Sequence, residues 1–348
     1  LLCGNIIGKI TGKMKGVIHM GYNPPYEITD KITGYISSIS EKVGQVSARS
    51  NTSSKPHLRR NNRIRSIHSS LRIESNPLSL NEVKDVINGR IVTGPAKEIQ
   101  EVRNAYDAYE QIPVIDPYSL SELKRIHGIM TRYVIDESGT FRRGEEGVFD
   151  GDRCIFMAPP AKMVPSLMDD LFSWMKESHG RVHPLIMGAV FHYEFVFIHP
   201  FADGNGRMAR LWHTAILAKW KPLFEYIPIE SQIEKFQESY YKAISACHVA
   251  GNSTLFIEFI LEQIDTVLDE IVDQSKTFGE EVTEYEKRLL EIMEYNEPYT
   301  AGTLLELLGL KSRDSLRHNY LDPAIRHGFV SMTLPNKPNS KNQRYVKR

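Results

Sequence analysis

The sequence predicts a mainly α-helical protein that carries one β-hairpin and ends in a separate winged helix-turn-helix domain. Apolar residues spaced three or four apart recur along most of the chain, which indicates helices. Between residues 139 and 160 this spacing gives way to frequent glycines and β-forming residues. After residue 276, three short helical patterns precede β-like residues, which is the order of elements in a winged helix.

Composition limits the kind of protein this is. The 41% hydrophobic and 25% charged residues are ordinary for a soluble globular protein, and 43 basic residues balance 43 acidic ones. No overall charge therefore points to nucleic acid. The three cysteines lack metal-ligand spacing, so we expect a reducing compartment and a cytoplasmic protein. No apolar run reaches the roughly 18 residues of a membrane span, so no membrane association is expected.

Four regions follow from these patterns. We expect a tail of unassigned origin over residues 1–20, an N-terminal helical region over 21–115, a helical core with the hairpin over 116–275, and the winged helix over 276–348. Glycines and lysines interrupt the tail too early for the apolar stretch of a secretory signal. The length of the chain suits two or three domains.

Helices in the N-terminal region are predicted by apolar spacing and by start signals. Ile32, Ile39 and Val43 lie on one helical stripe after a proline-rich entry. A later helix is expected to begin at Ser79, because Glu82 three residues on completes the pattern of a capping box.

The core is predicted to begin with a helix opened by Ser119 or Ser121. A hairpin follows, in which Asp150 and Gly151 form a typical turn step. Longer helical patterns then lead through the core; they cover residues 164–177, 184–197, 206–220, 232–248 and 254–274.

The segment HPFADGNGRMAR, residues 199–210, is a poor core segment, because little of it can be buried without cost. Gly204 and Gly206 fall where a loop becomes a helix, and they let the backbone approach a ligand closely. The N–H groups at a helix start attract anions, above all phosphates. Arg207 and Arg210 lie one turn apart on the same face, a spacing that suits successive phosphates of a nucleotide.

Two more residues of this segment predict phosphoryl chemistry. Asp203 is placed to hold the Mg²⁺ that nucleotide phosphates bring. His199 precedes the loop, where a neutral imidazole could take a proton from an incoming hydroxyl. A single histidine is more often a hydrogen-bonded structural residue, so the prediction depends on the combination.

HPFADGNGRMAR resembles the signature of Fic-domain proteins, HPFxxGNGRxxR, at every fixed position. The stretch FRRG…MAPPAKMVPSLMDDLFSWM looks like the Fic target-docking flap and the helix after it. IRSIHSSLRIESNPLSLNEV is similar to the N-terminal region of multidomain bacterial Fic proteins. The resemblance covers about residues 22–270 and implies a Fic helical core with a β-hairpin flap; a winged helix often accompanies such a core.

The resemblance implies a protein adenylyltransferase. Such an enzyme transfers AMP from ATP to a Ser, Thr or Tyr hydroxyl of a target protein, with self-modification expected as well. It implies that His199 is the general base, that Asp203 binds Mg²⁺, and that Arg207 and Arg210 hold the β- and γ-phosphates. The implied phosphate-binding residues are Gly204, Asn205, Gly206, Arg207 and Arg210. We also expect a homo-oligomer.

Three positions bear on the nucleotide. Tyr240 and Tyr241 match the aromatic pair that borders the adenine pocket in relatives, although both could simply pack within a helix. His248 stands where some relatives have Asn, so recognition of the base by an amide is not implied here. Gly206 stands where phosphate-transferring Doc toxins tend to have Lys, which favours AMP transfer.

SSLRIESN, residues 69–76, resembles the Fic inhibitory motif (S/T)xxxE(G/N), with Ser70 and Glu74 at the fixed positions. The resemblance implies that Glu74 pairs with Arg210 in the γ-phosphate site and inhibits the enzyme. Ser75 departs from the usual Gly or Asn, which predicts a differently shaped helix end and a looser inhibition. The plain alternative is a solvent-exposed glutamate on a helix.

Two other functions stay open. In some relatives the same glutamate positions a water that removes AMP, so a deAMPylase is one alternative. The other is a nucleotide-sensing regulator that binds DNA through the winged helix. Arg313, Arg317 and His318 would then lie on the recognition helix, with Lys337 and Lys341 near the wing tip.

Overall fold

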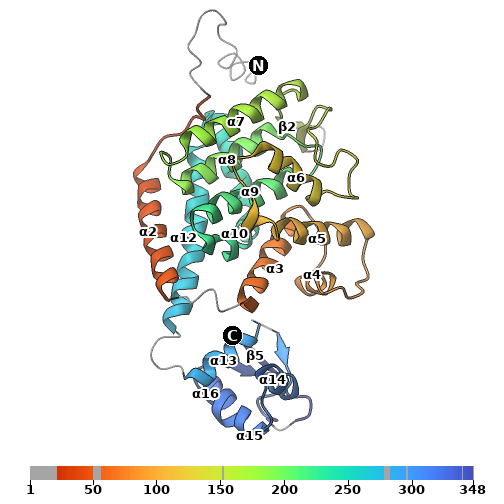
Figure 1. Ribbon diagram of the computed structural model, residues 1–348, viewed down its shortest axis with the longest axis vertical. Helices are drawn as coiled ribbons and strands as arrows, with labels where there is room; N and C mark the ends of the chain where they lie inside the picture. Colours follow the sequence, from red (N-terminus) through yellow and green to blue (C-terminus); the bar gives the residue numbers. More distant parts are fainter. Residues whose placement is uncertain are drawn as a thin grey trace, which may run out of the picture. The chain divides into compact units, whose positions relative to one another are not determined.

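The described part of the chain folds into helices with two small antiparallel sheets, as the computed structural model shows (Figure 1). The structure describes residues 22–49, 56–150, 153–277, 283–294, 297–338 and 340–347. The expected tail and Gly151 of the expected hairpin turn lie outside the described residues. The predicted class, mainly α with a hairpin, is confirmed. Two compact units are present, one formed by the residues up to Val43 with Arg63–Leu268 and the other by Gly44–Asn62 with Asp269–Arg348.

The N-terminal region is helical. Its helices are α2 (Asp30–Arg49), α3 (Pro56–Ile73), α4 (Leu80–Ile87) and α5 (Ala96–Tyr109), followed by a 3₁₀ turn at Ile112–Val114. The capping box predicted at the start of α4 is present: the Ser79 hydroxyl accepts from the Glu82 N–H, and the Glu82 carboxylate accepts from the Ser79 N–H at 2.8 Å. These bonds satisfy N–H groups that a helix start leaves without partners.

The core begins with α6 (Leu120–Met130), which Ser119 caps by accepting from the Glu122 N–H. The predicted hairpin follows as β1 (Gly147–Asp150) and β2 (Arg153–Met157), which pair antiparallel with Gly147 opposite Met157. The core helices after it are α7 (Val164–Ser178), α8 (Pro184–Ile198), α9 (Asn205–Trp220), α10 (Ile229–Lys235), α11 (Gln237–Ala250) and α12 (Thr254–Thr277), with 3₁₀ turns at Ala161–Met163 and Pro222–Tyr226.

Helices α8 and α9 form the centre of the first unit (Figure 1). The sequence of α8 is apolar on all sides except at His192 and Glu194, as expected of a buried helix, and all its residues from Leu185 to Phe195 are buried. Along one flank of this unit α2 runs beside α12, where Thr29 and Lys42 bond to Glu258 and Asp265. The two central helices meet at the segment 199–204, so the best-packed part of the core positions that loop.

One predicted helix is broken. Residues 232–248 were expected to form one helix, but the chain leaves helical geometry at Phe236 (φ −114°, ψ 34°), which separates α10 from α11. Directly after the break, the Gln237 side chain donates to the Ile73 carbonyl at 3.1 Å. The apolar spacing continues through the break, so periodicity could not reveal it. The contact between Gln237 and the end of α3 joins residues that are distant in sequence, so no local pattern could predict it.

The second unit contains the short helices predicted after residue 276, and the β-like residues that follow them form paired strands. Its elements are α13 (Glu284–Ile292), β3 (Pro298–Tyr299), α14 (Ala301–Leu308), α15 (Arg313–Ser315), a π-helix (Leu316–Leu321), α16 (Asp322–Arg326), β4 (Val330–Met332) and β5 (Tyr345–Lys347). The strands are ordered β3-β5-β4. Strand β3 was not predicted, because two residues are too few to show a period. Leu289, Leu304, Leu316 and Tyr320 belong to the core of this unit.

The third helix of this unit is irregular. Its middle turn is a π-helix, in which the Asp322 N–H bonds to the Arg317 carbonyl five residues earlier. Pro323 follows and has no N–H to donate, so a regular ladder cannot pass through it. Elsewhere among the described residues, Cys247 is a buried free thiol. No helix in the described ranges has both the length and the apolar character needed to cross a bilayer.

Candidate active site

The segment 199–210 forms the connection between α8 and α9 and the first turns of α9. His199 ends α8 in the left-handed conformation (φ 51°, ψ 59°), and Gly204 adopts the same region (φ 81°) where α9 begins. A methyl group at Gly204 would lie 3.1 Å from the Thr131 Cγ2 atom. Both the backbone conformation and the available space therefore favour glycine at this position.

Asn205 holds the loop closed from within. Its side-chain oxygen accepts from the Phe201 N–H at 2.9 Å, and its side-chain nitrogen donates to the Phe201 carbonyl at 2.7 Å. The amide is therefore used within the loop. A contribution of Asn205 to phosphate binding would come from its backbone N–H at the start of α9.

His127 of α6 supports the same loop, a role that was not predicted from the sequence. Its ring stacks on Phe201 with centroids 3.6 Å apart. The Gly139 N–H donates to Nδ1 at 2.9 Å, so Nε2 carries the proton and donates to the Asp203 carbonyl at 3.0 Å. Burial lowers the pKa of His127 to about 4, which keeps the ring neutral. In the sequence His127 follows Ile126 in an apolar stripe, where nothing marks it as a support for a distant loop.

The His199 ring has the protonation state of a general base. Its Nδ1 lies 3.4 Å from the Val196 carbonyl, which favours a proton on Nδ1 and a lone pair on Nε2. Burial lowers the pKa of His199 below its ordinary 6.5. The imidazole is therefore neutral at pH 7 and able to accept a proton.

Arg207 and Arg210, near the start of α9, are only 3% and 2% exposed. Arg207 donates to Glu101 Oε1 of α5 at 3.0 Å and to Asp203 Oδ1 at 2.9 Å. A guanidinium held out of water needs such partners, because an unpaired buried cation costs several kcal/mol. Arg207 is thus neutralised by two carboxylates.

Arg210 faces the end of α3. Its Nε donates to the Ser70 hydroxyl at 3.0 Å, and its Nη2 donates to the Ser70 carbonyl at 3.0 Å and to Glu74 Oε1 at 2.7 Å. The structure therefore brings Ser70, Glu74 and Arg210 together, although 136 positions separate the last two.

The end of α3 places the Glu74 carboxylate. Helix α3 ends at Ile73, and two backbone bonds close its end: the Ser75 N–H donates to the Arg72 carbonyl and the Asn76 N–H to the Leu71 carbonyl. This is the Schellman pattern, which needs a left-handed residue after the helix. Ser75 occupies that position with φ 66°. Glycine or asparagine adopts this conformation at lower cost, so serine leaves the helix end strained.

Gly206 gives Glu74 its space. A methyl group at Gly206 would collide with the Glu74 carboxylate and would lie 3.1 Å from Arg210 Nη1. The pair between Glu74 and Arg210 therefore depends on the absence of a side chain at residue 206.

Glu101 is a further residue of the site that was not predicted from the sequence. Its Oε1 accepts from Arg207, and its Oε2 accepts from the Asn76 side chain at 3.0 Å. Asn76 also donates to the Glu98 carbonyl at 3.2 Å. The segment that carries Glu74 is therefore tied to Arg207 through one carboxylate. No local pattern could reveal this link, since it joins residues 106 positions apart.

The two tyrosines have different surroundings. Tyr240 is 2% exposed and its hydroxyl pairs with His192 Nε2 at 2.9 Å, whereas Tyr241 is 47% exposed. Tyr240 thus packs in the core, and Tyr241 is open to solvent. His248 stacks on Phe156 of β2 with centroids 4.2 Å apart, and its Nε2 is buried without a hydrogen-bond partner.

A magnesium ion would find one protein ligand here. No group of three or more His, Cys, Asp or Glu side chains able to hold a metal occurs in the described residues. The Asp203 side chain is 39% exposed beside Arg207, and its contacts run through Oδ1. Mg²⁺ at nucleotide sites is often held by one or two carboxylates and the substrate phosphates, so this donor set fits the ion.

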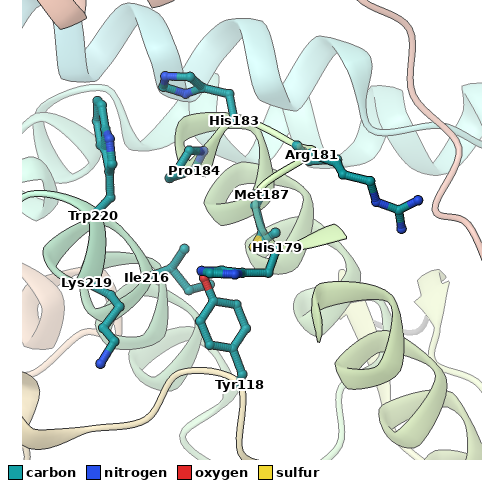
Figure 2. A pocket seen from close by; sticks show the side chains of 11 residues that line it. Tyr118, His179, Arg181, His183, Pro184, Met187, Ile216, Lys219 and Trp220 are labelled. Carbon is teal, nitrogen blue, oxygen red and sulfur yellow. The ribbon is translucent and has the colours of Figure 1, made fainter. Parts of the chain in front are cut away.

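A separate cavity of about 520 Å³ lies at the other ends of α8 and α9 (Figure 2). The residues around it include Tyr118, His179, His183, Met187, Ile216 and Trp220. None of the site residues predicted from the sequence lines it. Helix α8 has 15 residues, so its two ends are about 22 Å apart, and the cavity is separate from His199.

Two family models match the chain. Residues 117–217 match the Fic/DOC family, and residues 285–346 match the C-terminal domain of the Fic-like "Filamentation induced by cAMP" proteins. The first match contains the whole segment 199–210.

Solved structures and curated proteins agree with these matches. A Fic family protein from Desulfovibrio desulfuricans G20 is 40% identical, with a TM-score of 0.70 over 94% of this chain and 98% of that chain. A Fic-domain signaling protein from Bacteroides thetaiotaomicron shares the fold, with a TM-score of 0.56 over 73% of this chain and all of that one at 20% identity. "Protein adenylyltransferase Fic" of Aedes aegypti is 28% identical over 215 residues, or 59% of this chain and 41% of the relative. "Protein adenylyltransferase fic-1" of Caenorhabditis elegans is 23% identical over 62% of this chain and 42% of its own length. The chain thus spans about two fifths of these two curated relatives.

Proposed function

This chain belongs to the Fic family, and we propose that it transfers AMP from ATP to a hydroxyl side chain of a protein, releasing pyrophosphate. One observation carries the proposal: a neutral histidine and two buried arginines surround a glycine-rich helix start. The curated relatives that are named adenylyltransferases support the same reaction.

The reaction follows from the chemistry of the site. His199 Nε2 takes the proton of the acceptor hydroxyl, and the hydroxyl oxygen then attacks the α-phosphorus of ATP. The bond between the α-phosphorus and its bridging oxygen breaks, and pyrophosphate leaves with that oxygen. The N–H groups of Asn205 and Gly206 at the start of α9 hold the α- and β-phosphates, while the Gly204 N–H donates to Asp203 Oδ1. Hydroxyls of a target protein and of the chain itself are the proposed acceptors.

The arginines and one carboxylate hold the rest of the triphosphate. Arg207 binds the β-phosphate and Arg210 the γ-phosphate, as one helical turn between them allows. Asp203 would hold Mg²⁺, which supplies neutralising charge on the leaving pyrophosphate. Of the two tyrosines, Tyr241 is the exposed one, so it is the one that an adenine base can contact.

Inhibition follows because Arg210 is already paired with Glu74. While Glu74 occupies the guanidinium, the γ-phosphate cannot, so ATP binds with its α-phosphorus out of line. A misplacement of about 1 Å can cost roughly 100-fold in rate. We therefore propose that the protein rests in an inhibited state and becomes active when Glu74 leaves Arg210.

The test uses ATP labelled at two positions. The protein is incubated with Mg²⁺ and either α-labelled or γ-labelled ATP, as the parent, as Glu74→Gly and as Glu74→Gly with His199→Ala. We expect only the α label to stay on protein, most strongly with Glu74→Gly, and to fall by about 10² to 10⁴-fold when His199 is removed. Transfer of the γ label would exclude AMP transfer, and no labelling by a folded Glu74→Gly protein would exclude AMP transfer to the chain itself.

A second activity, removal of AMP, is favoured by one feature of Glu74. Its carboxylate is 37% exposed and contacts Arg210 through Oε1, so water has access to it. The test is release of label from AMP-modified protein. DeAMPylation predicts that the parent releases the label and that Glu74→Gly does not.

A further inference from the structure

Arg142 connects two parts of the site that are distant in sequence. It lies between α6 and β1, is 3% exposed, and its side chain donates four hydrogen bonds, all of them to backbone carbonyls. Such a buried guanidinium is costly unless its donors are satisfied.

The first pair of carbonyls belongs to the end of α8. Arg142 Nε donates to the His199 carbonyl at 2.7 Å, and Nη2 reaches the Ile198 carbonyl at 3.4 Å. The backbone N–H of Arg142 also donates to the Pro200 carbonyl at 3.0 Å. The last carbonyls of a helix have no N–H partners within it, and a cation there is favoured by the helix dipole. Arg142 therefore supports the left-handed backbone of His199, where glycine would ordinarily stand.

The second pair belongs to the two ends of the hairpin. Nη1 donates to the Gly144 carbonyl at 2.8 Å, before β1, and Nη2 donates to the Pro159 carbonyl at 2.5 Å, after β2. The planar guanidinium presents five donors in a fixed arrangement, which allows one side chain to hold both ends of the hairpin and the end of α8.

We propose that Arg142 is a positioning residue for the proposed AMP transfer: it fixes the backbone of His199 relative to both ends of the hairpin, so that the imidazole keeps its orientation. Arg142 makes none of its hydrogen bonds to the phosphate-binding residues at the start of α9. Its loss should therefore reduce turnover while leaving ATP affinity nearly unchanged. A residue that only stabilised the fold would change both or neither.

The experiment compares neighbouring arginines. Arg142→Lys keeps the charge but loses the planar fork, and Arg142→Met loses both. Arg143 is exposed and serves as the matched control through Arg143→Met. All variants are made in the Glu74→Gly protein, and kcat for α-label incorporation is measured beside the Kd for ATP. We expect kcat to fall by about tenfold in Arg142→Lys and by about 100-fold in Arg142→Met, with the Kd within about threefold. Arg143→Met should match its parent.

A second measurement separates this inference from the proposed function. Hydrogen exchange is followed in peptides that cover residues 144–147, 156–159 and 198–204. Arg142→Lys should raise exchange in all three together, and Arg143→Met in none. If no variant transfers AMP, the proposed function fails and the exchange result decides the inference. A folded Arg142→Lys protein with parental kcat and parental exchange would overturn it, as would an equal loss of kcat and ATP affinity.

Discussion

His199 and Ser75 are non-glycine residues in the left-handed region, and each one adjoins chemistry that the proposed function needs. His199 is the proposed base, and Ser75 directly follows the inhibitory Glu74. Partners hold both residues in place, since Arg142 binds the His199 carbonyl and the Asn76 N–H closes the turn around Ser75. Backbone strain of this kind persists only where the surrounding structure enforces it.

The burial of His199 predicts a pH profile. A base acts in its deprotonated form, and a lowered pKa keeps that form present at lower pH. The rate should therefore fall as pH decreases, with the midpoint of that fall below pH 6.5. The measurement is kcat/KM for α-label incorporation by Glu74→Gly between pH 5 and 8. A decline centred at or above pH 6.5 would contradict the assignment of His199.

Some residues of the site could be predicted from the sequence, and others could not. The segment 199–210 is predictable because its chemistry is local: glycines, arginines and a carboxylate follow one another at spacings that a helix start requires. His127, Glu101 and Arg142 were not predictable, because each acts through backbone or side-chain atoms that tertiary folding brings to it.

Helix α3 is the element on which inhibition depends. Its Schellman end places Glu74 beside Arg210. The Asn76 side chain holds the segment after the helix by donating to the Glu98 carbonyl and the Glu101 carboxylate. The weak point is Ser75, because serine pays a conformational cost there that glycine does not.

Replacing that serine should tighten inhibition. Ser75→Gly removes a left-handed strain of about 1 kcal/mol, part of which is offset by the greater freedom of glycine in the unfolded segment. We expect the basal rate of AMP transfer to fall by roughly two- to fivefold. Ser75→Ala keeps the strain and should not lower the rate. The measurement is the initial rate of α-label incorporation at saturating ATP. A faster rate in Ser75→Gly than in the parent would show that the helix end does not control Glu74.

Elements were predictable where periodicity was long and unbroken. The capped start of α4 and the buried α8 follow directly from their sequences. The break at Phe236 was not predicted, because the apolar spacing continues through it. The π-helix before Pro323 was not predicted either, because it depends on the N–H that proline lacks. Strand β3 is only two residues long and exists because β5 pairs with it.

The two compact units have separate cores, and the site lies wholly in the first. Arg317 and His318, the candidate DNA-contacting residues of the second unit, lie 3.8 Å and 3.3 Å from Asp322 carboxylate oxygens. This pairing weakens the case for a regulator that acts mainly on DNA, since the Arg317 guanidinium already has an acidic partner.

Removing the residues after 277 should leave AMP transfer intact. A chain of residues 22–277 keeps every contact described for the site, so we expect α-label incorporation within about threefold of the full chain. Thermal unfolding checks that the shortened protein is folded. Loss of AMP transfer by a folded fragment would mean that the second unit takes part in catalysis.

If Glu74 inhibits by occupying Arg210, a double-mutant cycle will reveal the coupling between the two residues. Initial rates of α-label incorporation are measured at saturating ATP and Mg²⁺ for the parent, Glu74→Gly, Arg210→Ala and the double variant. We expect a measurable basal rate in the parent, a rise of several-fold or more in Glu74→Gly, and no rise from Glu74→Gly when Arg210 is already alanine. Equal rates in the parent and Glu74→Gly, or the same rise with and without Arg210, would contradict the claim.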